Sequence, residues 1–322
     1  MRAVLCLLFL ISTAAIAQPD SLYLNPKHDT EKIPLVPIWT QQNKATLDFS
    51  EVAFVNWNSG GTNSISALLG VFFSRTYTVK YFNWTNKLQA RYGINKQQEQ
   101  EFRKTDDHFE ITSNLGYRTD TLTNWYFSAR FNFKTQLTNG YSYPDTSNPI
   151  SQFVAPGYLF LGGGVEYGRN IDELSLYFSP LTLKSTFVLD ETLANKGAFG
   201  VKPAILDDEG NVLQKGEKVR KELGMLLSGS HETVLMDNIK VVNQFSLYTD
   251  YINDFGNVDV DWAMNVDFKV NQFVRATFGS HLKYDNDVKT LEPVENQEEE
   301  FAERGAKVQW KQLLGIGVVV DF

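Results

Sequence analysis

Apolar and polar residues alternate over long stretches of this chain. In the clearest stretch, 258–270, every second residue is apolar, and the positions between them include Asp259, Asp261 and Asp267. Successive side chains of a β-strand point to opposite faces of the sheet, so this period of two predicts a strand with one apolar and one polar face. The same alternation recurs at 84–94, 125–134, 274–285 and 307–322.

Weaker alternation adds further segments and brings the expected total to about twelve strands. These segments lie near 45–56, 63–79, 107–118, 157–169, 173–188, 217–230 and 236–251. Strands of soluble proteins typically have five or six residues, whereas about 9–11 are needed to cross a membrane at a tilt. The segment lengths therefore favour an all-β, antiparallel up-and-down transmembrane barrel, with its apolar face towards lipid and its charged residues lining the lumen.

The connections between these segments alternate in length. The short ones lie around 79–81, 119–121, 169–171, 231–233 and 271–272. The others are mostly longer and polar, and they lie near 56–62, 95–106, 137–156, 189–216, 252–257 and 286–306. Outer-membrane barrels have short turns on the periplasmic side and longer loops outside, so the sequence predicts an outer-membrane location with both termini in the periplasm.

The N-terminal pattern predicts a secretory signal peptide over residues 1–17. Arg2 precedes an apolar run that ends in an A-x-A cleavage site at 15–17. Cleavage removes Cys6, the only cysteine, so no disulfide or cysteine metal site is expected in the mature chain. Residues 18–43 hold four of the ten prolines and are predicted to form an extended periplasmic tail, which leaves 44–322 for the barrel.

Charge and aromatic residues narrow the range of partners. A formal net charge of −8 without a basic stripe argues against nucleic acid. The expected partners are membrane lipid and lipopolysaccharide, the barrel-assembly machinery during biogenesis, and possible proteins of an outer-membrane complex. Aromatic residues towards strand ends predict girdles at headgroup level. They are Trp84, Tyr92, Trp125, Tyr284 and Trp310. The terminal Phe322 is similar to the assembly signal that ends bacterial outer-membrane proteins.

A short motif lies in the first long connection. Its residues are Asn56, Trp57, Gly60, Gly61 and Asn63. The two glycines permit positive φ and asparagine bonds locally to the backbone, so the motif predicts a tight loop. The segment resembles the N-W-x-x-G-G-x-N signature of an uncharacterised, domain-of-unknown-function family of Bacteroidota-type outer-membrane barrels. That resemblance implies a fold and a location, and it implies no activity.

The predicted lumen face carries charges of both signs. The candidates for lining the lumen are Lys87, Arg91, Arg118, Arg130, Lys134, Asp259, Asp261, Asp267, Arg275, His281, Lys283, Lys307 and Lys311. Basic residues of the third to fifth strands would face acids of the tenth, as in a solute channel. Basic residues of the last two strands could instead neutralise those acids and fill the bore. Twelve strands lie between the eight of a filled barrel and the sixteen to eighteen of an aqueous one, so a filled interior is favoured and a channel stays open.

Catalytic signals are weak. His281 is the only histidine expected inside a strand, and its neighbour Ser280 must point to the opposite face, so the two cannot act as base and nucleophile. The run 162–164 of three glycines lies in a strand without a following helix and does not match a phosphate loop. Acidic runs at 207–209 and 285–303 are read as solvated loops. No catalytic, metal-binding or cofactor-binding residue is assigned.

The sequence therefore predicts a non-enzymatic outer-membrane barrel. Its most favoured role is a binding, scaffolding or accessory subunit of an outer-membrane assembly, secretion or uptake complex, because the tail and the long loops offer surfaces for partners. One alternative is a narrow, porin-like channel for small solutes, which the lumen acids would make weakly cation-preferring. Another alternative is an outer-membrane hydrolase, which rests on fold analogy alone.

Overall fold

The structure is a computed structural model that describes residues 36–53, 62–120, 123–169, 174–253, 255–286, 289–294 and 297–322. The predicted signal peptide and residues 18–35 of the predicted tail lie outside the described residues and remain predictions. The barrel belongs to one compact unit, Ile33–Phe322.

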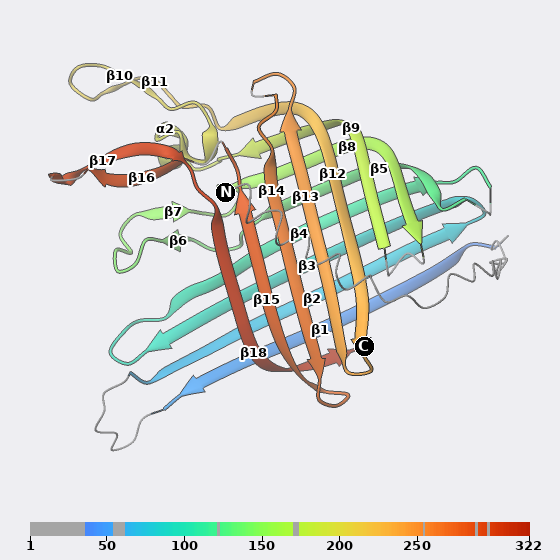
Figure 1. The fold of residues 1–322 in the computed structure, drawn as a ribbon. Helices are drawn as coiled ribbons and strands as arrows, with labels where there is room; N and C mark the ends of the chain where they lie inside the picture. The colour runs from blue at the N-terminus through green and yellow to red at the C-terminus, as the bar shows by residue number, and fades with distance from the viewer. Residues whose placement is uncertain are drawn as a thin grey trace. The chain divides into compact units, whose positions relative to one another are not determined.

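Within the described residues, twelve strands close into one antiparallel barrel, as the sequence predicted (Figure 1). These strands are β1 (Ile38–Val52), β2 (Ser64–Val79), β3 (Phe82–Gln97), β4 (Arg103–Tyr117), β5 (Trp125–Thr135), β8 (Gly157–Arg169), β9 (Leu174–Phe187), β12 (Val219–Met236), β13 (Ile239–Asp250), β14 (Asp259–Lys269), β15 (Val274–Tyr284) and β18 (Gln309–Asp321). Each pairs with its neighbours along the chain, and β1 pairs with β18 to close the ring. Closure leaves no open sheet edge along the paired length, which is what a strand structure needs in lipid.

The outer surface of this barrel is apolar. On β5, Trp125 and Phe127 are 56% and 63% exposed, and on β18 Leu314 and Ile316 are 75% and 64% exposed. Ser128 and Thr277, whose strand positions place them on the opposite face, are buried. A closed barrel with apolar side chains outside and polar ones inside is stable only in a membrane, so this chain is an outer-membrane β-barrel.

The two ends of the barrel differ as predicted. At one end the connections are short, for example 80–81, 237–238 and 270–273, and we call this the short-turn end. At the other, long-loop end the connections include 136–156 and 188–218. β1 begins and β18 ends at the short-turn end, which faces the periplasm in outer-membrane barrels.

Several boundaries differ from the prediction. β1 begins at Ile38, so residues 38–43, predicted as tail, pair with β2 although their sequence does not alternate, because the backbone of β2 up to Thr78 needs hydrogen-bond partners. β12 extends to Met236, so His231 lies within a strand, and the turn falls at 237–238. The predicted loop 286–306 contains a hairpin of β16 (Lys289–Val294) and β17 (Gln297–Ala306).

β9 carries an irregularity at Pro180. The pairing of β9 with β8 shifts between Gly163 and Val165, and its pairing with β12 shifts between Gly224 and Leu226. Both shifts lie opposite Pro180, which has no backbone N–H to donate to a ladder. The bulge moves the apolar phase of β9 from Phe178 to Leu181, and both side chains stay exposed on the outer surface.

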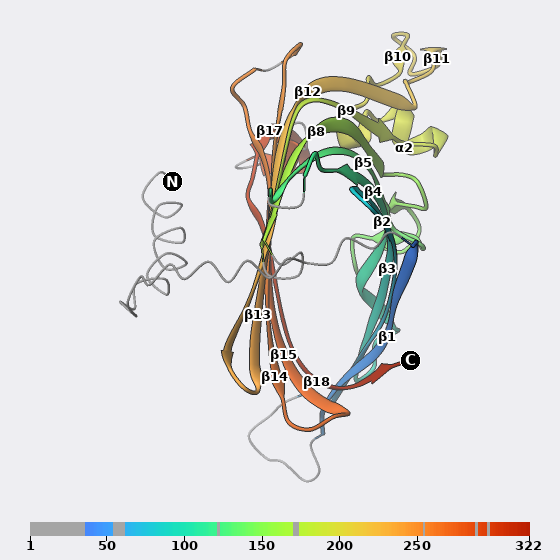
Figure 2. The same ribbon diagram turned by 90° about the vertical axis from the view of Figure 1, so that its right-hand side faces the viewer.

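The long-loop end also carries small elements of its own. They are β6 (Gly140–Tyr141), β7 (Pro149–Ser151), α2 (Glu191–Asn195), η1 (Ala198–Gly200), β10 (Ile205–Leu206) and β11 (Val212–Gln214). Ala155, Val188, Leu193, Ala194 and Val201 form a small apolar core between loops 136–156 and 188–218. We call these two loops the loop cap (Figure 2). None of the described helices has the length and apolar character of a membrane span.

Candidate functional site

The lumen of the long-loop half is crossed by ion pairs. Lys134 lies next to the last residue of β5, and its Nζ is 3.7 Å from Asp261 Oδ2 on β14. Four strands separate β5 from β14 around the barrel, so this pair spans the bore. Lys134 is also 3.8 Å from Glu110 on β4, and Asp261 is 2.7 Å from His281 Nε2 on β15. We call Lys134–Asp261 the first bridge.

A second bridge spans the bore between β18 and β4. Lys311 Nζ lies 2.7 Å from Asp106 Oδ1, and three strands separate the two around the barrel. Asp106 also accepts a 3.2 Å bond from Arg91 Nε on β3. Both bridges lie near the long-loop ends of their strands, because Asp106 is four residues into β4 and Lys311 is three residues into β18.

Lys184 on β9 is a buried cation of the lumen, and its side chain is 4% exposed. Its Nζ lies 2.7 Å from Asp259, 3.4 Å from Glu222 and 3.8 Å from Asp285. Three carboxylates around one ammonium offset the desolvation of that charge. Lys184 Nζ also lies 5.2 Å from the ring centroid of Tyr248.

An apolar cluster narrows the lumen beside these charges. Tyr177, Leu226 and Tyr248 are buried from β9, β12 and β13, and Phe160 packs edge-on against Tyr248 at 5.9 Å. The Arg130 guanidinium lies 4.1 Å over the Tyr177 ring.

Arg130 on β5 joins this cluster to polar groups on other strands. It is 3.1 Å from Glu166 on β8 and donates a 3.0 Å bond to Ser228 Oγ, two strands further around the barrel on β12. Glu166 in turn accepts bonds from Asn114, Ser128 and Ser175.

The short-turn half of the lumen is built differently. On β2 and β3, neutral side chains bond to one another: Thr76 to Thr85 at 3.1 Å, Thr85 to Asn83 at 3.0 Å, and Asn83 to Thr78 at 3.2 Å. Lys87 follows on the same face of β3 and is exposed.

The remaining lumen candidates occupy varied places. Arg275 pairs with Asp267 at 3.2 Å and with Asp48 on β1 at 3.6 Å. Lys283 lies 3.8 Å from Asp261. Arg118 follows the last residue of β4 and stacks on Tyr126 at 5.8 Å. Lys307 precedes the first residue of β18, so its assignment to that strand was wrong: alternation ran past the strand's true start.

The sequence leaves two arrangements of the lumen charges open, walls of opposite sign or charges that neutralise one another, and the described lumen residues mostly form pairs. Most of the basic residues expected on one wall contact an acid, and the acids that complete these pairs were not singled out in the sequence. The partners missed are Asp48, Asp106, Glu110, Glu166 and Glu222, together with the cation Lys184. Glu110 lies two residues from His108 and four from Asp106, so the period of two could have identified it. Lys184 follows the phase shift at Pro180, which concealed its face.

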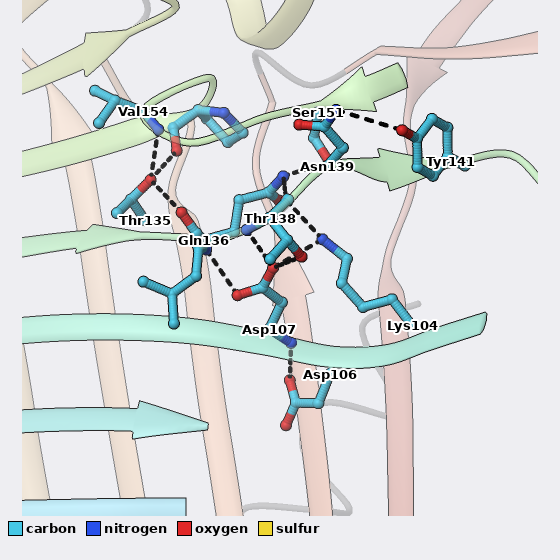
Figure 3. Close-up of polar contacts among 12 residues, drawn as sticks. Lys104, Asp106, Asp107, Thr135, Gln136, Thr138, Asn139, Tyr141, Ser151 and Val154 are labelled. Carbon is cyan, nitrogen blue, oxygen red and sulfur yellow. Dashed lines mark hydrogen bonds and ion pairs between the residues drawn. The ribbon is translucent and has the colours of Figure 1, made fainter. Parts of the chain in front are cut away.

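Loop 136–156 is fixed to the rim of the barrel through β4 (Figure 3). Asp107 accepts bonds from the backbone N–H groups of Leu137 and Thr138, at 2.7 and 2.9 Å, and from the Thr138 hydroxyl. Lys104 Nζ lies 2.9 Å from Asp107 and donates to the Thr138 carbonyl. At the end of β5, Thr135 Oγ1 accepts from the Val154 N–H. These contacts hold the loop in one place above the strands.

The first-loop motif lies mostly outside the described residues. Asn56, Trp57, Gly60 and Gly61 are not described, and Asn63 accepts a 2.8 Å backbone bond from Gln98. Phe322 sits at the barrel seam, where its N–H donates to the Asn43 carbonyl and its ring meets Phe73 edge-on at 6.3 Å. The assembly-signal role of Phe322 stays a prediction.

The His281 imidazole bonds to Asp261 inside the lumen, whereas Ser280 accepts a bond from Trp310 Nε1 on the outer face. A Ser280–His281 pair is therefore not formed, as the strand geometry predicted. Across the described ranges, no group of three or more His, Cys, Asp and Glu side chains is placed to hold a metal ion.

Known proteins resemble this chain only broadly. A model of a family described as "Protein of unknown function (DUF3078)" matches residues 49–141, from the end of β1 to β6 and less than a third of the chain. The sequence matches none of the curated proteins. The Bacteroidota origin and the motif of the resemblance stay predictions.

Similar solved structures are outer-membrane barrels. An outer-membrane channel from Pseudomonas putida F1 is 11% identical, with 92% of this chain and 98% of that chain covered and a TM-score of 0.40. The translocator domain of the autotransporter NalP from Neisseria meningitidis is 8% identical, with 87% of each chain covered and a TM-score of 0.35. The NanC porin is 10% identical, with coverage of 86% and 98% and a TM-score of 0.34. At these scores the likeness carries no argument about function.

Proposed function

We propose that this outer-membrane barrel is a non-enzymatic subunit that binds a partner protein at its loop cap and does not conduct solutes. It would act as a binding, scaffolding or accessory subunit of an outer-membrane assembly, secretion or uptake complex. The observation that carries the proposal is the pair of bridges that span the bore, Lys134–Asp261 and Lys311–Asp106. A solute would have to break charge-assisted contacts in a site of low dielectric to pass them.

The loop cap supports the binding half of the proposal. It has its own apolar core and is fixed to the rim by Asp107, so it presents a defined surface. Exposed apolar side chains gather there, including Ile150, Phe153 and Leu189. Exposed apolar patches rimmed by polar residues mark protein interaction sites.

The first test is to extract the native protein in mild detergent and to measure the identity and stoichiometry of the co-purifying proteins by quantitative mass spectrometry. We expect at least one protein at fixed stoichiometry. A lone barrel would overturn the binding role.

Planar-bilayer recordings separate this role from the narrow channel. We expect no unitary conductance from the wild type, and steps from a Lys134→Ala/Lys311→Ala double variant in which both bridges are removed. A Lys196→Ala/Lys202→Ala double variant, which removes two loop-cap cations outside the lumen, serves as the charge-matched control. Regular steps from the wild type would favour the channel instead.

A further inference from the structure

The β10–β11 hairpin of the loop cap is apolar and uncovered. Ile205 and Leu206 of β10 are 55% and 54% exposed, and Val212 and Leu213 of β11 are 48% and 70% exposed. Leu206 pairs with Val212 on one face of the hairpin, and Ile205 pairs with Gln214 on the other. Apolar side chains therefore lie on both faces of a two-stranded ribbon, and such a ribbon is only marginally stable in water by itself.

The hairpin is nevertheless held firmly at its base. The Asn195 carbonyl at the end of α2 accepts a 2.9 Å bond from the Ala204 N–H, and the Asn195 side-chain oxygen accepts one from the Gly216 N–H. Both ends of the hairpin are therefore anchored to the same residue of the loop cap, Asn195. Figures 1 and 2 both show β10 and β11 extending away from α2 and the barrel.

The tip of the hairpin is also ordered, and it is anionic. Asp207 accepts bonds from the N–H groups of Glu209 and Asn211, at 3.0 and 2.7 Å, and Gly210 takes a φ of 86° that closes the turn. Asp208 and Glu209 are exposed, and Glu209 Oε2 accepts a 3.5 Å bond from Asn211 Nδ2. Residues 204–214 contain no Lys or Arg, so the tip carries three carboxylates without a cation of its own.

We propose that the β10–β11 hairpin is the partner-binding element of this barrel and inserts into an apolar groove with a basic mouth on a separate protein. This inference rests on the proposed binding function and names the element and the chemistry of its partner. A groove is required because apolar side chains lie on both faces, and basic residues at its mouth complement Asp208 and Glu209. A second copy of this chain does not fit, because it would bring two anionic tips together.

The test uses the full-length protein in intact cells, with a photo-crosslinking residue in place of Leu213. The matched position is Ile252, which is 70% exposed in the β13–β14 loop. We expect position 213 to crosslink to one other protein, and the crosslinked peptide to contain apolar residues close to Lys or Arg. Resistance of the barrel to unfolding by SDS without heating controls for folding.

Charge reversal then tests the complementarity. We expect Asp208→Lys/Glu209→Lys to lower the crosslinking yield at 213 at least about tenfold, because attraction becomes repulsion. The control Glu99→Lys/Glu101→Lys makes the same charge change on the β3–β4 loop and should leave the yield within about twofold. An unchanged yield in the first variant overturns the basic mouth.

The remaining outcomes separate this inference from the proposed function. Crosslinks from 213 to lipopolysaccharide alone, or to a second copy of the chain, overturn the inference. Crosslinks to a partner from 252 but none from 213 overturn it too, and leave the binding function standing. If neither position crosslinks to a protein and nothing co-purifies at fixed stoichiometry, both fail.

Discussion

The two halves of the lumen are filled by side-chain contacts of different reach. In the long-loop half, side chains reach across the bore as ions, for example Lys134 to Asp261 and Lys184 to Asp259. In the short-turn half, the contacts stay along the wall. Thr76, Thr85 and Asn83 bond to residues of the same or the adjacent strand, and Arg275 pairs with Asp267 on the adjacent strand and with Asp48 on β1, beyond one intervening strand. Contacts along a wall stabilise strand pairing, whereas contacts across the bore also join distant strands. The bridges that join distant strands lie towards the long-loop end.

The largest effect is expected at Lys184, a buried cation in the long-loop half of the lumen. Lys184→Met removes the ammonium between Glu222, Asp259 and Asp285 and leaves buried carboxylates without their cation. We expect the free energy of unfolding, measured by urea titration in phospholipid vesicles, to fall by about 3–5 kcal/mol.

The matched substitution in the other half is Lys87→Met. The Lys87 side chain is exposed, and among the described residues it has no ion pair within 4.0 Å. We expect the free energy of unfolding of this variant to change by no more than about 0.5 kcal/mol. Equal losses for the two lysine variants would remove the contrast between the halves.

An intermediate effect is expected at the β9 bulge, between the two halves. A methyl group added at Gly164, on the lumen face of β8, would collide with the Phe178 carbonyl oxygen, whereas one added at Gly163 meets nothing within 4 Å. We expect Gly164→Ala to lower the free energy of unfolding by about 1–3 kcal/mol in the same titration, because the backbone itself must move. Gly163→Ala is the control, and its free energy of unfolding should stay within about 0.5 kcal/mol of the wild-type value. A similar loss at both positions would mean that the bulge does not press on β8.

The smallest effect is expected at the neutral side chains of β2 and β3 in the short-turn half. Thr85→Val keeps the side-chain shape and removes hydroxyl contacts to Thr76 and Asn83. We expect the free energy of unfolding to fall by about 0.5–1.5 kcal/mol, which is the usual net contribution of a neutral hydrogen bond. Thermal unfolding of the detergent-solubilised barrel provides the ranking. A Tm drop larger than that of Lys184→Met would show that the neutral contacts of β2 and β3 carry more of the stability than the ion pairs around Lys184.

The sequence could predict the barrel because its evidence is local. Alternation over 258–270 assigns each residue of β14 to a face, and turn lengths assign each strand to an end, without knowledge of any distant residue. The bulge at Pro180 also has a local signal, because a proline without an N–H and a change of apolar phase both lie within a few residues.

Strand ends were less certain for the same reason. Residues 38–43 and 231–236 do not alternate although they belong to strands, so alternation could not mark where β1 begins or where β12 ends. Those limits depend on pairing with β2 and β13, which only the closed barrel specifies.

By itself, then, the sequence determined the fold, the membrane location and the two faces of the clearly alternating strands. Only the tertiary structure decided which charges meet. Lys134 and Asp261 lie on strands that are far apart both in the chain and around the ring, so no spacing in the sequence connects them. Barrel closure and side-chain reach bring them to 3.7 Å, and these depend on every strand at once.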